Sequence, residues 1–355
     1  MRIDLFVVAG EPSGDLHGSR LIEALLLKRP NMNIGAVAGP RMRKLPIQEF
    51  FPMESLCVMG FIDVLLALPK LVRQFFAIRK KILELSPKAV VFIDYPGLTL
   101  RLARSLRKKG YFGKLIHFIC PTVWAWGKKR IPLMAQNLDL LLTIFPFESQ
   151  YFARTRLPVR YVGHPLSAPI AEFAPSGKFQ GKILGLFPGS RKTEIERNLP
   201  LQLKVAQRLR ALNPSLTIAI SGIDVPSEDT YELMRASHLA IATSGTVTLE
   251  LALHGIPTVV NFAIKPIDCF LAQKIFRINL PFYCIANIVV NRSVFPELFG
   301  PRLTEEQLFF WVHKLWTDEQ ARERCREGCA EVRKSLGVKR AAEEAAASIL
   351  STIDF

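Results

Sequence analysis

Four polar side chains with the chemistry for proton transfer or sugar binding alternate through one tight turn near the start of the chain. They are Glu11, Ser13, Asp15 and His17. An apolar run at 5–9 precedes this turn and a helical pattern at 21–27 follows it, so a buried strand leads through the turn into a helix. Ligands of open parallel sheets bind beyond the carboxyl ends of strands. The two carboxylates would repel a phosphate, which favours sugar hydroxyls or proton transfer. The alternative is that Ser13 or Asp15 only caps the helix.

A further carboxylate, Asp94, directly follows the apolar strand pattern 90–93 and precedes Tyr95-Pro96-Gly97. At the carboxyl end of a buried strand it would face the ligand crevice. Partial burial would raise its pKa, which suits a general base. The alternative is an aspartate that only initiates the Pro-Gly turn.

Two later turns have the opposite character, because they are small and carry no acid. Gly189-Ser190-Arg191 follows the strand pattern 183–187, and Ser244-Gly245-Thr246 follows the pattern 239–243. Both precede helices, whose N-termini attract phosphates, and Arg191 supplies a two-pronged donor for a pyrophosphate. Glu250 lies on the same helix face as Thr246 and could accept hydrogen bonds from ribose hydroxyls.

Two other segments could meet a lipid or a phosphate. Apolar residues recur at helical spacing through 60–81, with basic residues gathered towards its end, which suits a membrane interface or an acyl chain. The alternative is an ordinary core helix. The segment 121–130 holds Trp124 and Trp126, which could pack in the core, followed by three cations that could meet a substrate phosphate.

The elements that must position these residues alternate between strand and helix along the chain, which is typical of parallel sheets covered by helices. Pro and Gly residues cluster at 166–182 and predict a linker. We therefore expect two Rossmann-like α/β domains facing a cleft, 1–165 and 183–330. Residues 331–355 are expected to form a C-terminal helix that could return to the first domain. The stretch after Ile220 is shorter than a regular sheet of this size would need.

Composition restricts the class of protein. The 355 residues are 49% hydrophobic and 22% charged, which indicates a globular chain, and the net charge of +16 favours anionic partners. The sequence shows no nucleic-acid-binding signature, no apolar stretch of membrane-spanning length and no signal peptide. The six cysteines have no zinc spacing. We expect a cytoplasmic protein with reduced thiols and no nucleic-acid partner.

Taken together, these segments resemble the lipid-A-disaccharide synthases, glycosyltransferases of the GT-B type. The matching motifs, in family order, are G-E-P-S-G-D-L-H-G at 10–18, V-M-G-F at 58–61, I-D-Y-P-G at 93–97, P-T-V-W-A-W-G-K-K-R at 121–130, V-G-H-P at 162–165, L-F-P-G-S-R at 186–191, A-T-S-G-T-V-T-L-E at 242–250 and A-N-I-V-V-N-R at 286–292. Any one of these motifs is weak, but the set spans most of the chain and is highly specific.

The resemblance implies transfer of 2,3-diacylglucosamine from its UDP derivative to 2,3-diacylglucosamine 1-phosphate, with inversion and without a metal or other cofactor. The resemblance then implies three partners: a UDP-sugar donor, a phosphorylated glycolipid acceptor and the cytoplasmic face of the inner membrane, where the protein is peripheral. Whether the chain forms a homo-oligomer stays open. The residues carried over to the donor are Gly189, Ser190, Arg191, Ser244, Gly245, Thr246, Glu250, Asn287 and Arg292. Those on the acceptor and catalytic side are Glu11, Ser13, Asp15, His17 and Asp94.

The chain departs from the family pattern at Gly97, where many members carry a second acid. The general base therefore stays open among Asp94, Glu11, Asp15 and His17. Two rival functions also stay open. One is another GT-B transferase or epimerase acting on a UDP-sugar with a soluble substrate, and the other is a non-catalytic module that binds anionic lipid.

Overall fold

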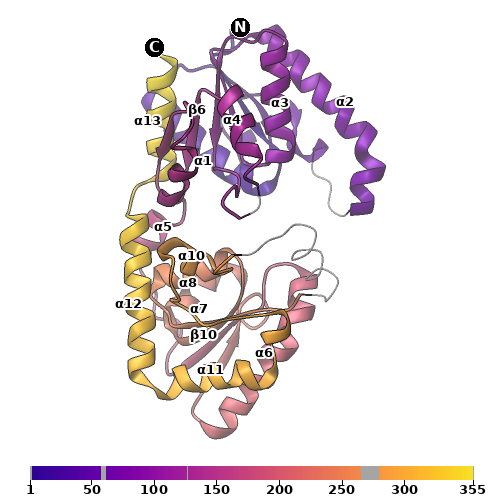
Figure 1. Cartoon of the computed structure of the whole chain (residues 1–355). Coiled ribbons are helices and arrows are strands. Elements are labelled where there is room, and N and C mark those ends of the chain that lie inside the picture. The colour runs from indigo at the N-terminus through magenta and orange to yellow at the C-terminus, as the bar shows by residue number, and fades with distance from the viewer. Residues whose placement is uncertain (1, 57–60, 126, 265–279, 355) are drawn as a thin grey trace. The chain divides into compact units, whose positions relative to one another are not determined.

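The computed structural model describes the chain except residues 1, 57–60, 126, 265–279 and 355, and for 61–67 it describes the backbone alone. The chain folds into two compact units (Figure 1). Unit 1 comprises Met1–Pro165 together with Lys339–Phe355, and unit 2 comprises Leu166–Val338. Among the helices that the structure describes, none is long and apolar enough to cross a bilayer.

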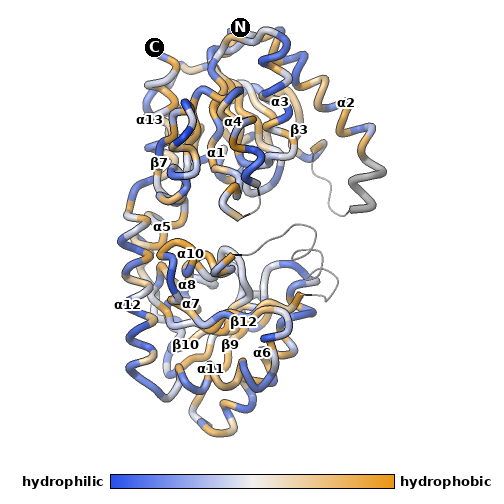
Figure 2. Tube along the Cα trace, viewed as in Figure 1, coloured by the Kyte–Doolittle hydropathy of each residue, from blue (hydrophilic) through white to orange (hydrophobic). Residues whose placement is uncertain are grey.

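Unit 1 is built on a parallel sheet with the strand order β3-β2-β1-β4-β5-β6-β7. Its strands are β1 (Leu5–Ala9), β2 (Ile34–Ala38), β3 (Gln48–Pro52), β4 (Ala89–Ile93), β5 (Lys114–Phe118), β6 (Leu140–Thr143) and β7 (Val159–Tyr161). Its helices are α1 (Pro12–Lys28), α2 (Phe61–Leu85), α3 (Pro96–Lys108), α4 (Arg130–Asn137) and α13 (Ala341–Ile353), with 3-10 turns η1 (Met42–Lys44), η2 (Met53–Ser55) and η3 (Pro146–Phe152). Every residue of β1, β2 and β4 is buried, as in parallel strands covered on both faces. Along the coloured part of α2, by contrast, hydrophobic and hydrophilic positions alternate (Figure 2).

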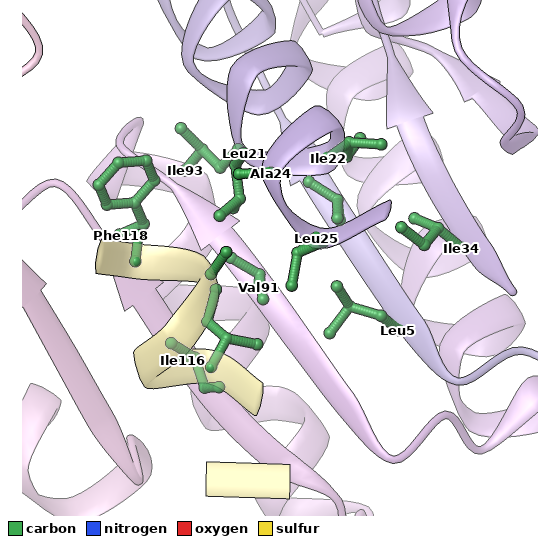
Figure 3. Packing of buried hydrophobic residues seen from close by; sticks show 14 of the residues in the cluster. Leu5, Leu21, Ile22, Ala24, Leu25, Ile34, Val91, Ile93, Ile116 and Phe118 are labelled. Atoms are coloured by element: carbon green, nitrogen blue, oxygen red, sulfur yellow. The ribbon is translucent and has the colours of Figure 1, made fainter. Parts of the chain in front are cut away.

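The core of unit 1 joins the two ends of the chain. Leu21 and Leu25 of α1 pack with Leu5 and Val91 of the sheet (Figure 3), and Ile349 of α13 belongs to the same buried cluster. The C-terminal segment expected at 331–355 is therefore divided between the units. Helix α12 (Glu319–Leu336) ends in unit 2, and only α13 lies in unit 1.

Unit 2 has a shorter parallel sheet in the order β12-β11-β10-β8-β9. Its strands are β8 (Ile183–Phe187), β9 (Thr217–Ile220), β10 (Ser237–Thr243), β11 (Thr258–Phe262) and β12 (Glu297–Phe299). Its other elements are α5 (Ser167–Ala171), α6 (Lys192–Leu212), η4 (Ser227–Asp229), α7 (Thr230–Ala236), α8 (Thr246–His254), α10 (Ile285–Val290), η6 (Gly300–Arg302), α11 (Glu305–Thr317) and α12. The segment 166–182, expected as a linker, thus begins with a helix of unit 2. The short stretch after Ile220 holds only a bridge from Ser221 to Val225, η4 and α7 before β10.

Each sheet has one point where the strand order reverses. In unit 1 it lies between β1, whose chain continues to β2, and β4, whose chain continues to β5 on the other side. In unit 2 it lies between β8 and β10. The loops leaving the two strands diverge at such a point and open a crevice at their carboxyl ends. The turns at 10–13 and 94–97 meet at the first reversal, and those at 189–191 and 244–246 meet at the second.

Candidate active site

The opening turn presents Glu11 at the start of α1. Glu11 is the N-cap residue, its backbone is extended, and no side chain caps the helix. Ser13 Oγ instead donates a hydrogen bond of 2.8 Å to Glu11 Oε1. The alternative in which Ser13 or Asp15 caps the helix is therefore wrong, and the Glu11–Ser13 pair stays at the surface of the turn.

Asp94 lies at the end of β4 and is electrostatically coupled to Glu11. Burial, reinforced by the negative charge of Glu11, raises the pKa of Asp94 to about 6. Asp94 and Tyr95 both adopt left-handed backbone, with φ of 45° and 50°. Two consecutive non-glycine residues in this region are strained, which is typical of functional turns. Gly10 is required beside them, because a Cβ there would overlap the Tyr95 ring.

Asp15 has a different place from its neighbours in the turn. Its side chain is buried, and its carboxylate accepts hydrogen bonds from the backbone N–H groups of Gly39, Arg41 and Met42 at 2.8–3.1 Å. Both oxygens are used, Oδ1 by Gly39 and Met42 and Oδ2 by Arg41. This arrangement fixes the loop that follows β2 and favours a positioning role for Asp15 over that of a base.

Asp15→Asn is therefore expected to lower the free energy of unfolding by about 1–3 kcal/mol, because the single amide oxygen cannot replace both carboxylate oxygens as the acceptor of all three N–H groups. Urea unfolding measures this change. Ser13→Ala is the control. It removes an exposed hydroxyl that bonds Glu11 in the same turn, and it should change stability by less than about 0.5 kcal/mol. An Asp15→Asn protein of unchanged stability would contradict the positioning role.

His17 lies one helical turn after Ser13 and close to His164, which packs against the Phe145 ring at 5.0 Å. Burial, followed by the charge of Arg20, lowers the pKa of His17 to about 4. The imidazole is therefore neutral near pH 7. At that pH the imidazole can accept a proton. With a pKa of about 4, however, it is a weaker base than the Asp94 carboxylate, whose pKa is about 6.

Glu148, in η3 after β6, is a buried carboxyl group that was not among the residues predicted from the sequence. It accepts hydrogen bonds from the backbone N–H groups of Ile144 and Phe145 at 3.2 and 3.1 Å. Burial raises the pKa of Glu148 to about 8, with a smaller contribution from Asp94. Its position after a strand end in Phe145-Pro146-Phe147-Glu148 was the available signal. Trp124 is buried nearby against the Phe147 ring, and Trp126 lies outside the described residues.

In unit 2, seven of the nine residues assigned to the donor line one pocket of about 510 Å³, which we name the donor pocket. They are Gly189, Ser190, Arg191, Ser244, Gly245, Thr246 and Glu250. The volume is within the range of small-molecule sites. The pocket is formed at the strand-order reversal by the turns after β8 and β10 and by the N-termini of α6 and α8, where backbone N–H groups suit an anion.

Glu194, which the sequence patterns did not single out, occupies part of the turn that is expected to bind an anion. Its Oε2 accepts hydrogen bonds from the backbone N–H groups of Ser190 and Arg191, and its Oε1 pairs with Arg191 Nη1 at 2.9 Å. Gly189 is required at φ 116°, where a Cβ would lie 2.7 Å from Glu194 Cβ. The glutamate three residues after an N-cap is a capping-box spacing that could have revealed it.

Glu250 lines the donor pocket as a half-buried carboxyl group. Burial raises its pKa, while a hydrogen bond of 3.2 Å from the Tyr231 hydroxyl opposes that shift. The acid is thus held in place by α7 and α8 together. Oε1 accepts the hydrogen bond from the Tyr231 hydroxyl, and Oε2 has no hydrogen-bond partner among the described residues, so it can accept from a ligand hydroxyl.

The structure does not bring Asn287 and Arg292 to the donor pocket. Asn287 is buried, and its amide bonds the backbone of Val294 and Phe295 at 2.8–2.9 Å. Arg292 forms two contacts of 2.7 Å with the Glu331 carboxylate. Their arrangement favours a role in holding the turn after α10. In the part of the chain that the structure describes, no three His, Cys, Asp or Glu side chains are grouped as metal ligands.

The comparisons with known proteins agree with these motifs. A family model described as lipid-A-disaccharide synthetase matches residues 5–224 and 221–350. The chain belongs to this family. A lipid-A-disaccharide synthase of Geobacter sulfurreducens is 32% identical over 98% of this chain and 97% of its own length. That of Chlamydia trachomatis serovar D is 36% identical over 93% of this chain, which spans 59% of that relative.

Solved structures share the fold at low identity. The kitacinnamycin glycotransferase matches with a TM-score of 0.65 and 13% identity, covering 99% of this chain and 100% of that one. The UDP-GlcNAc 2-epimerase of Neisseria meningitidis matches with a TM-score of 0.62 and 11% identity, again covering 99% and 100%. The predicted family and the predicted fold class, a GT-B fold with two parallel-sheet α/β units, are therefore confirmed.

Proposed function

We propose that this chain is an inverting glycosyltransferase that forms the lipid A disaccharide. It transfers 2,3-diacylglucosamine from UDP-2,3-diacylglucosamine to the 6-hydroxyl of 2,3-diacylglucosamine 1-phosphate, and releases UDP. Unit 2 binds the donor, and unit 1 supplies the acceptor and catalytic groups. The observation that carries this proposal is the gathering of seven family donor residues in one pocket of a lipid-A-disaccharide synthetase family member.

The proposed reaction is a single displacement. Asp94 takes the proton of the acceptor hydroxyl, whose oxygen forms a bond to the anomeric carbon while the bond to UDP breaks. Negative charge develops on the leaving diphosphate, where Arg191 and the N-terminus of α8 stabilise it. Glu250 binds the ribose hydroxyls. The Neisseria meningitidis epimerase, which shares the fold, is bound to UDP-GlcNAc in its crystal structure, and this supports a uridine nucleotide as the ligand of this fold.

Thin-layer chromatography tests this function directly. The purified chain, supplied with UDP-2,3-diacylglucosamine and 2,3-diacylglucosamine 1-phosphate, should yield the disaccharide 1-phosphate and stoichiometric UDP. Conversion of the donor without the acceptor would indicate an epimerase or hydrolase. Absence of any product would favour the non-catalytic lipid-binding module.

We also propose that α2 docks the protein on the cytoplasmic face of the inner membrane. Leu68, Val72 and Phe76, spaced four residues apart, form an exposed apolar stripe, each with 45–49% of its surface accessible. Phe75 instead packs against the core of unit 1. Arg73 and Lys80 are exposed beside the stripe and suit anionic headgroups.

Val72→Ser with Phe76→Ser is therefore expected to weaken binding to anionic phospholipid vesicles about tenfold or more, because both apolar groups leave the bilayer interface. Vesicle flotation measures the bound fraction. Phe112→Ser, a change at an exposed phenylalanine between α3 and β5, is the matched control. Equal flotation of the α2 variant and the control would contradict docking through the stripe.

A further inference from the structure

Apart from the donor pocket, unit 2 contains a cavity of about 440 Å³ at the C-terminal end of α8. Its lining comes from α5, α7, α8 and α12 and shares no residue with the donor pocket. The lining residues are Ile170, Ala171, Phe173, Arg235, Leu253, His254, Gly255, Arg326 and Arg333. Three of them are arginines, and none of these nine residues is acidic. We name this cavity the α8 pocket.

Two of the arginines are directed to the end of α8. Arg235 Nη1 donates to the carbonyl oxygen of His254 at 3.0 Å, and Arg333 Nη1 donates to those of Ala252 and Leu253 at 3.3 and 3.4 Å. These contacts complement the negative end of the helix dipole. A guanidinium has five N–H donors, so a contact through one nitrogen leaves others for a ligand.

The third arginine is already neutralised. Arg326 Nη1 contacts the carboxylates of Glu319 and Glu323 at 2.9 and 3.0 Å. The positive charge available to a ligand therefore comes from Arg235 and Arg333.

A second observation at the α8 pocket is that His254 is buried with an unused ring nitrogen. The residue is 4% exposed, and its Nε2 has no hydrogen-bond partner among the described residues. Phe173 and Tyr231 pack against the imidazole at 5.7 and 5.3 Å and fix the ring. A buried polar atom normally has a partner, and here the residues around it supply none. His254 lines the α8 pocket, and as the Nε2–H tautomer it holds a donor that none of the described residues uses.

We propose that the α8 pocket binds a phosphate dianion. Arg235 and Arg333 supply the charge and charge-assisted hydrogen bonds, and His254 Nε2 supplies a neutral donor. This site goes beyond the proposed glycosyl transfer, which uses the donor pocket on the other end of the same helix. The phosphate site can therefore be tested independently of the proposed glycosyl transfer.

Nitrogen-15 NMR of the histidine-labelled full chain tests the proposal. Inorganic phosphate is titrated at constant ionic strength, and His254→Gln assigns the His254 resonance. We expect the Nε2 signal of His254 to shift saturably, and Arg235→Gln or Arg333→Gln to weaken that binding about tenfold or more. Arg191→Gln in the donor pocket should leave the His254 response unchanged.

Arg235→Lys and Arg333→Lys are the controls for loss of structure, because lysine keeps the positive charge and can still donate to a carbonyl oxygen at the end of α8. Retained thermal unfolding with intermediate phosphate affinity would support the proposal. A His254 signal that phosphate does not move would overturn it. An equal shift with chloride, or a shift abolished by Arg191→Gln, would do the same.

Discussion

Asp94→Asn is expected to lower kcat for disaccharide formation by about 10²–10⁴-fold, because asparagine keeps the shape of the side chain but cannot take a proton. The strained turn and the coupling to Glu11 place this carboxyl group at the strand-order reversal of unit 1. KM for the acceptor should change much less than kcat, since the substituted amide can still hydrogen-bond a sugar hydroxyl. Steady-state rates with both substrates measure the two parameters.

The pH dependence of the same reaction separates Asp94 from the other candidates. A base must be ionised, so kcat/KM should fall as pH drops below about 6, the pKa of Asp94. Glu11→Gln removes a negative charge beside Asp94. Removing it favours the ionised form of Asp94 and lowers its pKa, so the acidic limb of the pH–rate profile should move to lower pH. A limb near pH 4, the pKa of His17, would indicate the histidine instead.

Gly97→Ala is the matched control for both experiments. Gly97 lies in the first turn of α3, and a Cβ there meets nothing within 4 Å. Activity should be unchanged, although this is the position at which many relatives carry an acid. Normal turnover by Asp94→Asn, combined with loss in Glu11→Gln or His17→Ala, would move the base to the opening turn.

The sequence predicted the buried strands because a strand covered on both faces must be apolar throughout, as in β1 and β4. It did not predict β3 and β12. Gln48 and Glu49 of β3 are exposed on an edge strand, where one neighbour supplies all the backbone pairing and apolar residues are not required. The same holds for β12, a three-residue edge strand that begins with Glu297.

The sequence predicted those candidate site residues that lie directly after the carboxyl end of a strand. Asp94 and the turns of the donor pocket needed only the order of strand, turn and helix. Asp15 and Asn287 could not be assigned in this way, because their polar atoms bond backbone groups that lie 24–27 and 7–8 residues away. A side chain that satisfies buried backbone looks, in a sequence, the same as one that binds substrate. Only the contacts distinguish Asp15 from Glu11.

Arg191→Ala is expected to lower kcat by about 10²–10³-fold, the usual loss when one donor to a developing negative charge is removed. The guanidinium follows the glycine turn at the mouth of the donor pocket, and its side chain is 80% exposed. Its present partner is Glu194, and an exposed ion pair of this kind contributes only about 0–1 kcal/mol. Arg191 can therefore exchange that carboxylate for a diphosphate at little cost.

Because the Arg191–Glu194 ion pair is weak, the loss of kcat in Arg191→Ala can be interpreted without a large change in stability. Because little stability depends on Arg191, urea unfolding of Arg191→Ala should change by less than about 1 kcal/mol, so that lost activity reports chemistry and not misfolding. Lys192→Ala is the control, since the side chain of Lys192 is 89% exposed and lies 3.9 Å from the Glu196 carboxylate, in a weak surface ion pair. Wild-type kcat in Arg191→Ala would rule out the leaving-group role. An equal loss in Lys192→Ala would mean that general positive charge at the turn, and not this guanidinium, assists departure of UDP.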